Sequence, residues 1–397
     1  MKRRLLPILM TLVLVCALPI WAAFVTSGDV TNPLVCTAGA TLPDLQAKID
    51  AAADNATITL DSDTTITETL VITGKTLTLD LNGCTLRMTG TGSVLKVSGR
   101  ATLTITDSRP QNPHTGSYAG LPAGGVITGG KADKGGGILL DGGCTLKLTG
   151  GCITDCHAIG TVGGGVVLNG DTAILYMSGT ARIENCTAGE TWGANAIFNS
   201  GTMYADGGTV DGTVNNQGTI RLSEGAAAET VFNGTVYNRS AGTIKAGRYN
   251  ETVENRGTIT GGTFCGGVTD DGGTIEDGAY ETVKFNSDNG AQAKEEKVLR
   301  GQKVSNPAAP TKSGHTFTGW YLGVAPYDFD TPVIAPLTLT AKWEKVPSSG
   351  GYYYYPTTDT KTDDTKGSPK TADPGVALYA ALSLLSLTGL TCITKKR

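Results

Sequence analysis

Two consecutive stretches of the chain repeat one another: GGGILLDGGCTLKLTGGCITDCHA (135–158) and GGGVVLNGDTAILYMSGTARIENCTA (163–188). Their triple glycines begin at 135 and 163, which is 28 residues apart. Apolar residues mark three short strands in each copy. In the first copy they are Leu139/Leu140, Leu146/Leu148 and Ile153. The second copy matches them in order with Val166/Leu168, Ile174/Tyr176 and Ile183. Three strands per repeat of this length predict one coil of a solenoid, whose inward side chains stack on those of the next coil.

Farther along, a shorter motif takes over. The segments NSGTM, NQGTI, NRSAGTI, NRGTI and DGGTI begin at Asn199, Asn216, Asn238, Asn255 and Asp271. Asn and Gly favour tight turns, whereas Thr and Ile favour strands. Asn side chains at equivalent turns can also stack as hydrogen-bonded ladders, so we expect ladders of Thr and Asn along the solenoid.

The repeats are preceded by one helical segment and then by more strands. In residues 41–55, Leu45, Ile49 and Ala52/Ala53 recur at helical spacing, and Pro43 with Asp44 fits a helix start. After it, runs of four to seven residues alternate apolar and polar side chains and are broken by Gly, Asn or Asp.

With these patterns, residues 37–290 resemble the pectin-lyase-like right-handed β-helix family. The resemblance implies an all-β fold, a right-handed parallel β-helix whose first coil is capped by the opening helix. An array of β-sandwiches is the structural alternative.

The next segment, 292–345, concentrates aromatic residues that are scarce elsewhere. Its order GHTFTGWY (314–321), YDF (327–329) and LTLTAKW (337–343) resembles the internalin-type B-repeat, a small β-grasp-like module of bacterial surface proteins. His315 stands where that family usually has Tyr. The aromatic side chains suit the core of so small a domain, and an exposed platform for a partner or sugar is the alternative.

The N-terminus has the pattern of a secretory signal peptide (1–23). Lys2, Arg3 and Arg4 precede an apolar stretch, and small residues favour cleavage near Ala23. An uncleaved membrane anchor is the alternative.

The C-terminus combines three features. A polar stalk (346–367) leads to a pentapeptide, followed by an apolar segment (376–394) long enough for a transmembrane helix and a basic tail. This order resembles the cell-wall sorting signal (368–397) of Gram-positive surface proteins, in which sortase cleaves after Thr and links it to peptidoglycan. The resemblance implies recognition at Ser368, Pro369, Lys370, Thr371 and Ala372, with the bond to peptidoglycan at Thr371. Simple transmembrane retention is the alternative.

Charge and cysteine content restrict the partners. The net charge of −4 gives no basic field for nucleic acid. Seven cysteines lie between the signal peptide and the C-terminal apolar segment, and an odd number cannot all pair within one chain. Small buried apolar residues, disulfides or a metal site would each account for them, and we expect mainly the first, with no cofactor and no metal.

For catalysis, the best cluster in the sequence is Asp155, His157, Arg182 and Glu184. The repeat alignment places Thr154 opposite Glu184 and Asp155 opposite Asn185, so the two carboxylates are out of register. Glycosidases need paired carboxylates at matched positions. We therefore expect no catalytic residues and a non-enzymatic adhesin on the cell wall, which binds an extracellular glycan or protein along the solenoid face. A polysaccharide lyase or hydrolase, and a passive spacer, are the alternatives.

Overall fold

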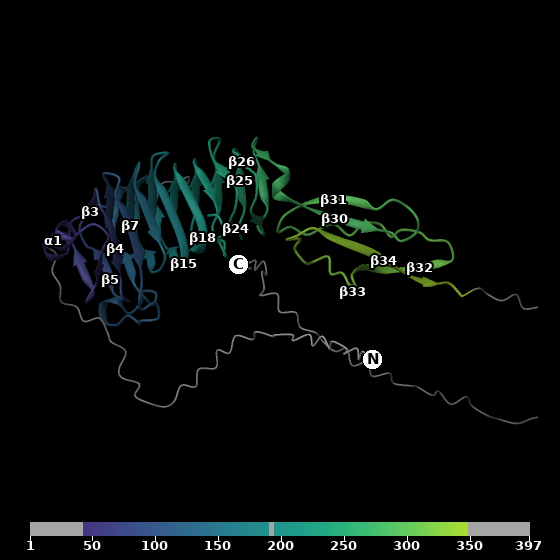
Figure 1. The fold of residues 1–397 in the computed structure, drawn as a ribbon, viewed down its shortest axis with the longest axis horizontal. Coiled ribbons are helices and arrows are strands. Elements are labelled where there is room, and N and C mark those ends of the chain that lie inside the picture. Colours follow the sequence, from purple (N-terminus) through teal and green to yellow (C-terminus); the bar gives the residue numbers. More distant parts are fainter. Residues whose placement is uncertain (1–42, 190–193, 348–397) are drawn as a thin grey trace, which may run out of the picture.

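The computed structural model describes residues 43–189 and 194–347, which form a stack of short parallel strands followed by a smaller sheet (Figure 1). The largest sheet has seventeen strands: β1 (Ala56–Thr59), β2 (Thr64–Ile66), β4 (Thr76–Asp80), β5 (Thr85–Met88), β7 (Thr102–Thr106), β8 (Val126–Thr128), β11 (Thr145–Leu148), β12 (Cys152–Thr154), β15 (Ile174–Glu184), β18 (Thr202–Val210), β20 (Thr219–Arg221), β21 (Val231–Phe232), β23 (Thr243–Ile244), β24 (Arg248–Tyr249), β26 (Thr258–Ile259), β27 (Thr263–Phe264) and β29 (Thr274–Ile275).

Two further parallel sheets complete the stack. Nine strands form one of them: β3 (Leu70–Thr73), β6 (Leu95–Ser98), β10 (Ile138–Asp141), β14 (Val166–Asn169), β17 (Ile197–Asn199), β19 (Val214–Asn216), β22 (Val236–Asn238), β25 (Val253–Asn255) and β28 (Val268–Asp270). Three strands form the other: β9 (Lys131–Lys134), β13 (His157–Val162) and β16 (Thr187–Ala188). Because each strand pairs in parallel with strands of the neighbouring coils, the predicted parallel β-helix is confirmed and the β-sandwich array is excluded.

The seventeen-strand sheet contains two rows that share β15 and β18. The first row runs β1, β4, β7, β11, β15, β18, β20, β23, β26, β29, and the second runs β2, β5, β8, β12, β15, β18, β21, β24, β27. In each coil the chain therefore passes through the nine-strand sheet, the first row and the second row.

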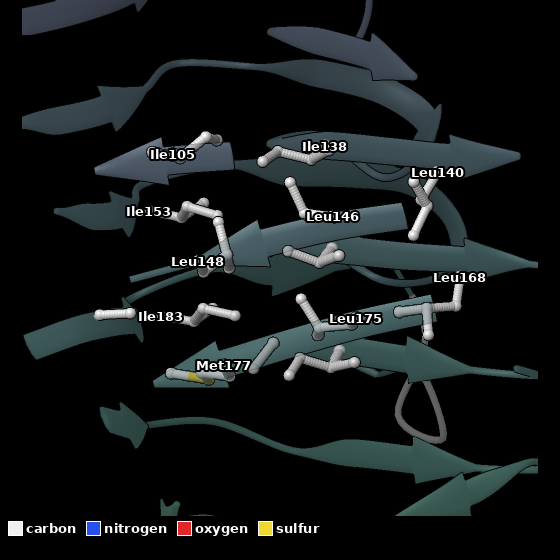
Figure 2. Close-up of a cluster of buried hydrophobic side chains, with 14 of the residues drawn as sticks. Ile105, Ile138, Leu140, Leu146, Leu148, Ile153, Leu168, Leu175, Met177 and Ile183 are labelled. Atoms are coloured by element: carbon white, nitrogen blue, oxygen red, sulfur yellow. The ribbon is translucent and has the colours of Figure 1, made fainter. Parts of the chain in front are cut away.

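Aliphatic side chains stack inside the coils, as Figure 2 shows for part of the core. Leu146 on β11 pairs with Leu175 on β15, and Leu175 pairs with Met203 on β18. All three are fully buried. Burying one such side chain contributes about 1.5–3 kcal/mol, so a column repeated over many coils is the main stabilising term.

The repeat alignment from the sequence is wrong by one residue at the second strand. It matched Leu146/Leu148 with Ile174/Tyr176, whereas the structure pairs them with Leu175 and Met177. The turn before β15 holds one more residue than the turn before β11, and a one-residue shift moves every side chain to the other face. Tyr176 therefore lies on the outer surface.

Helix α1 (Pro43–Ala51) covers the first coil, as the sequence predicts. Leu45 and Ile49 are buried against the core. The Gln46 amide donates to the Val71 carbonyl (3.1 Å) and accepts from the Val71 N–H (2.8 Å), so it takes the place of a neighbouring strand at the edge of β3. Lys75 Nζ donates to the carbonyls of Ile49, Asp50 and Ala52 at the end of the helix.

The smaller sheet is mixed and has five strands: β30 (Tyr280–Asn286), β31 (Lys294–Leu299), β32 (His315–Leu322), β33 (Ala325–Pro326) and β34 (Leu337–Lys345). β30 forms a hairpin with β31 and lies parallel to β34. The sequence placed the end of the β-helix at 290 and the start of the module at 292, whereas the structure places the whole of β30 in the module's sheet. β30 alternates buried and more exposed residues, a pattern that does not distinguish a solenoid strand from a strand of the module.

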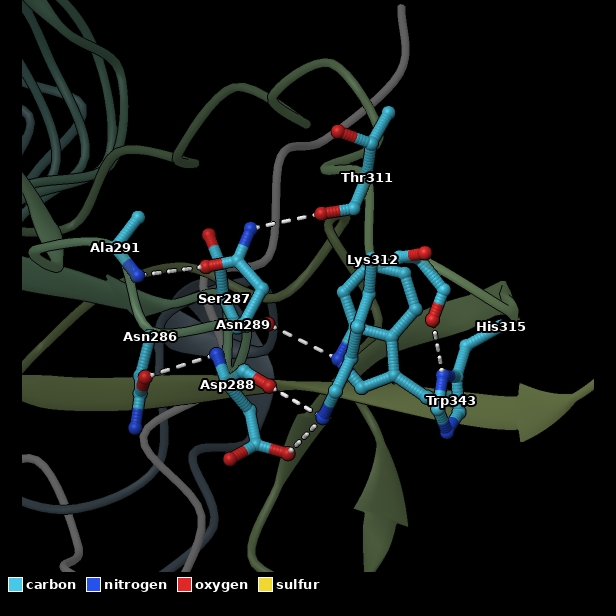
Figure 3. A network of polar contacts seen from close by, with 10 residues as sticks. Asn286, Ser287, Asp288, Asn289, Ala291, Thr311, Lys312, His315 and Trp343 are labelled. Atoms are coloured by element: carbon cyan, nitrogen blue, oxygen red, sulfur yellow. Dashed lines mark hydrogen bonds and ion pairs between the residues drawn. The ribbon is translucent and has the colours of Figure 1, made fainter.

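The module's aromatic residues form its core. Trp320 packs edge-on against Phe285 and Phe317, and Phe317 against Trp343. Figure 3 shows how the loop after β30 is held: Trp343 Nε1 donates to the Ser287 carbonyl (3.0 Å), and Lys312 Nζ to the Asp288 carbonyl (2.6 Å). The prediction of an aromatic core is thus confirmed for these residues.

The module is joined directly to the last coils. The Phe264 N–H donates to the Arg300 carbonyl (2.7 Å), and the Arg300 N–H to the Ala279 carbonyl (2.9 Å), next to the short 3₁₀ helix η2 (Asp277–Ala279). Another 3₁₀ turn, η1 (Gly116–Tyr118), lies in the long loop between β7 and β8. The edge of β27 is therefore covered by the segment that follows β31.

Several predicted segments lie outside the described residues. They are the signal peptide (1–23), most of the stalk, the sorting signal from Ser368 to Ala372 and the transmembrane segment 376–394. Within 43–189 and 194–347, no helix is long and apolar enough to cross a membrane.

Candidate functional site

The predicted asparagine ladder exists, but it lies inside the β-helix. Asn199, Asn216, Asn238 and Asn255 are fully buried. Each Nδ2 donates to the Oδ1 of the next residue in the series, at 2.7, 2.8 and 2.7 Å. The Asn ladder is thus confirmed, but its buried side chains cannot contact the ligand that was expected along the solenoid face.

The ladder ends at Asp270 and not at Asp271, which the motif spacing had matched with Asn255. Asn255 Nδ2 donates to Asp270 Oδ1 (3.0 Å), and the Gly273 N–H donates to the same oxygen (3.1 Å). A carboxylate suits the last position because it accepts hydrogen bonds and needs no further acceptor.

The outer surface has a groove where β15 and β18 bend between the two rows. Their pairing shifts register there, next to Gly179, Gly207 and Gly208. Gly208 has φ +77°, and a Cβ at this position would collide with the Ala181 carbonyl. Glycine is thus required for the two strands to bend together.

Two adjoining hollows form this groove, which we call the bend groove. The first, of about 560 Å³, lies over the bend and is lined by Gly179, Arg182 and Glu229 among others. The second, of about 760 Å³, is lined by Glu184, Asn185, Asp211, Gly212, Val231, Asn233, Asn250 and Glu251. Val231 belongs to both linings, so the hollows are neighbours.

Polar residues repeat at one outward position along the second hollow. Ile183 pairs with Val210, Val210 with Phe232, and Phe232 with Tyr249, so the residues that follow them occupy matching positions on four coils. These residues are Glu184, Asp211, Asn233 and Asn250, which we call the outer polar column. Asn233 Nδ2 donates to Asp211 Oδ1 (2.5 Å), and Asn250 Nδ2 to Asn233 Oδ1 (2.8 Å).

The best candidate cluster of the sequence, Asp155, His157, Arg182 and Glu184, does not assemble as a set of four. Arg182 and Glu184 both line the bend groove. Asp155 lies in the turn after β12 with φ +51°, and His157 belongs to the three-strand sheet, where its Nδ1 lies 2.8 Å from Thr187 Oγ1. Thr154 pairs with Glu184, as the alignment predicted.

Asp211 is the residue that sequence reasoning missed. It lies one coil beyond Glu184 and gives the groove two carboxylates at matching positions. The repeat changes length between these coils, so the 28-residue spacing does not lead from Glu184 to Asp211. The apolar match between Ile183 and Val210 is the signal that finds it.

Two tyrosines form a stacked pair on the outer face of the first row. The ring centroids of Tyr176 and Tyr204 lie 4.4 Å apart, with Lys147 next to one ring (5.9 Å) and Arg221 next to the other (5.4 Å). Partial burial raises the pKa of the Tyr176 hydroxyl, and the adjacent Tyr204 raises it further. Because the ring faces cover one another, the pair stabilises neighbouring coils and is not an open platform for a sugar ring.

The cysteines in residues 43–189 and 194–347 divide into two groups. Cys144, Cys152, Cys156 and Cys186 are free and buried, as expected of small apolar residues. Burial raises the pKa of the Cys152 thiol, and the Glu184 carboxylate raises it further. Cys84 and Cys265 are disulfide-bonded. Among the described residues, no group of three or more His, Cys, Asp or Glu side chains is placed to hold a metal ion.

Comparison with known proteins finds one matching family and two similar proteins. Residues 282–342 match the Listeria-Bacteroides repeat domain, which confirms the resemblance to the internalin-type B-repeat. Two proteins of Evansella cellulosilytica, one named a membrane protein and one a Gly-rich membrane protein, are 39% identical over 67 residues, or 16% of this chain. That segment is 10% and 8% of their lengths, so the chain spans about a tenth of the curated relatives it matches. No solved structure matches the chain.

Proposed function

We propose that this chain is a bacterial surface protein that holds a linear polysaccharide in the bend groove without cleaving it. The observation that carries the proposal is the shape of the groove, which follows the stacking direction of the coils. Its lining comes from five neighbouring positions of the second row, from Gly151 to Asn250. At about 4.8 Å per coil, these positions span roughly 20 Å, which suits several units of an extended polymer.

The chemistry of the lining also supports a sugar polymer. The outer polar column lines the second hollow with carboxylate and amide groups, and glycine and small side chains line much of the first. Sugar hydroxyls both donate and accept hydrogen bonds, so a periodic row of such groups along the groove can bind a periodic ligand.

A surface location is supported by the module. The Listeria-Bacteroides repeat match and the relatives named as membrane proteins fit a surface protein. On the sequence pattern we propose secretion with cleavage near Ala23, and covalent attachment to the peptidoglycan of a Gram-positive wall at Thr371 by sortase. Mass spectrometry of muramidase-released wall fragments tests this: Thr371 joined to a peptidoglycan amine is expected, and a chain intact to Arg397 contradicts it.

Retention of the full chain on a panel of plant, host and microbial polysaccharides tests the binding proposal. The chain is expected to be retained on at least one linear polymer without release of reducing or unsaturated ends. A chain retained on no polymer contradicts the proposal and supports the passive spacer.

Polysaccharide cleavage is the second candidate, because Glu184 and Asp211 lie at matching positions on neighbouring coils. Two carboxylates flanking one glycosidic bond are the minimum for hydrolysis, one as acid and the other as base or nucleophile. Asp211 accepts a hydrogen bond from Asn233, and Glu184 lies beside the Cys152 thiol.

Product assays separate the two candidates. Cleavage predicts that reducing ends are released from the retained polymer and that Glu184→Gln or Asp211→Asn abolishes the release. Asp155→Asn is the control, since Asp155 lies outside the bend groove. Binding alone predicts no product with any of the four proteins.

A further inference from the structure

The bend groove has an uneven charge. Five carboxylates line the two hollows, against one guanidinium, that of Arg182; the five are Asp107, Glu184, Asp211, Glu229 and Glu251. The Asp107 carboxylate already has partners within the fold, because its two oxygens accept hydrogen bonds from the Gly83 and Gly125 N–H groups at 2.7 and 2.6 Å. Arg182 Nη2 donates to the Ala123 carbonyl (3.1 Å). The lining therefore carries a net negative charge, and four of its carboxylates remain for contact with a ligand.

The outer polar column also lacks a donor at its Asn250 end. Asn250 Nδ2 donates to Asn233, whereas Asn250 Oδ1 is buried and accepts no hydrogen bond from any described residue. A buried acceptor without a donor is unfavourable, so this end of the column favours a ligand that brings a donor.

This pattern selects among polysaccharides. A polyuronate would bring further carboxylates against Glu184, Asp211, Glu229 and Glu251, and like charges in a partly desolvated groove repel. An ammonium group has three donors and no acceptor, and its hydrogen bonds to carboxylates are charge-assisted. Neighbouring coils are about 4.8 Å apart, so Glu184 and Asp211 present two such acceptors along the groove.

We propose that the bend groove binds a linear amino-sugar polymer with free amino groups, whose ammonium groups pair with Glu184 and Asp211. This inference rests on the proposed polysaccharide-binding function and names its ligand class.

The test compares three oligosaccharides of equal length with the full chain in a mild detergent at pH 6: a β-1,4-glucosamine oligomer, its fully N-acetylated form and an oligogalacturonate. We expect the glucosamine oligomer to bind at least ten-fold more tightly than the N-acetylated form, and more weakly as salt is raised. Glu184→Gln and Asp211→Asn are each expected to weaken it about five-fold or more, with the fold checked by circular dichroism.

Asp171→Asn is the matched control. Asp171 is an exposed turn residue that lines neither hollow, so it removes the same charge without touching the groove. An equal loss of affinity in this variant would mean non-specific attraction and overturn the inference. Equal or tighter binding of the N-acetylated or galacturonate oligomer would overturn the inference but leave polysaccharide binding intact. Binding of none of the three, together with no retention on the wider panel, would overturn both.

Discussion

At the scale of single residues, a shift of one position decides which side chains are inside. Leu175 and Tyr176 are neighbours, yet one stacks on Leu146 in the core and the other stacks on Tyr204 outside. The sequence shows that both belong to a strand, but the turn before it sets the face. The same shift moves the end of the asparagine ladder from Asp271 to Asp270.

The buried ladder predicts a large effect from one amide. Asn238→Ala removes the acceptor of Asn216 Nδ2 and the donor to Asn255 Oδ1. Leaving buried polar groups unpaired costs about 1–3 kcal/mol each, so we expect a loss of about 2–4 kcal/mol in the free energy of unfolding. Urea unfolding measures it, with the exposed Thr274→Ala as control. A loss no larger than that of the control would contradict the ladder's role.

Tyr249 predicts a dependence of stability on alkaline pH. Burial raises its pKa well above the ordinary value, and its ring stacks between Phe232 and Phe264. The neutral phenol is thus favoured in the folded state, so its contribution is complete below about pH 10, the unfolded pKa, and falls as pH rises beyond it. The slope for one such group is at most about 1.4 kcal/mol per pH unit.

Tyr249→Phe should reduce the alkaline loss of stability. At neutral pH the variant loses the hydroxyl's hydrogen bond to the Ala246 carbonyl, at about 1 kcal/mol. Above pH 10 its unfolding free energy should fall less steeply than that of the parent. Parallel curves for the two proteins from pH 8 to 11.5 would contradict the assignment.

At the scale of elements, the two ends of the β-helix are closed in different ways. α1 covers the N-terminal edge with a side-chain amide, whereas the module covers the edge of β27 with backbone. Both coverings remove unpaired strand edges, which otherwise invite pairing with another chain.

Gln46→Ala tests the helix cap. The variant leaves the Val71 N–H and carbonyl without their partner, so we expect faster hydrogen exchange at Val71 and a loss of about 1–3 kcal/mol in unfolding free energy. Gln217→Ala, an exposed turn residue, is the control. Unchanged exchange at Val71 would show that α1 does not protect this edge.

At the scale of the whole molecule, the sequence predicts the parallel coils, because repeats and alternation report directly on stacking. Helical spacing predicts the opening helix, and the order of aromatic residues predicts the module. The sequence does not predict the groove, which arises where β15 and β18 bend and depends on how turns of unequal length align the coils. The sequence places Glu184 in a candidate cluster, but Asp211 is its neighbour only through coil-to-coil register.

An ion pair next to the joint between β-helix and module is expected to stabilise the fold. Arg300 Nε lies 2.6 Å from Glu281 Oε1, and Glu281 is only 6% exposed. Arg300→Met would leave that carboxylate buried and unpaired, at a loss of about 2–3 kcal/mol. Calorimetry should show a lower unfolding temperature, partly restored when Glu281→Gln is added. A double variant no more stable than Arg300→Met would contradict this pairing.

The central claim is that a polymer lies in the bend groove, and blocking the groove tests it most directly. Thr209 lines the first hollow, whereas Thr243 lies on the first row away from it. Titration of the retained polysaccharide should show at least a ten-fold loss of affinity for Thr209→Trp and affinity close to that of the parent for Thr243→Trp. Equal affinity for both variants would place the ligand elsewhere and contradict the account.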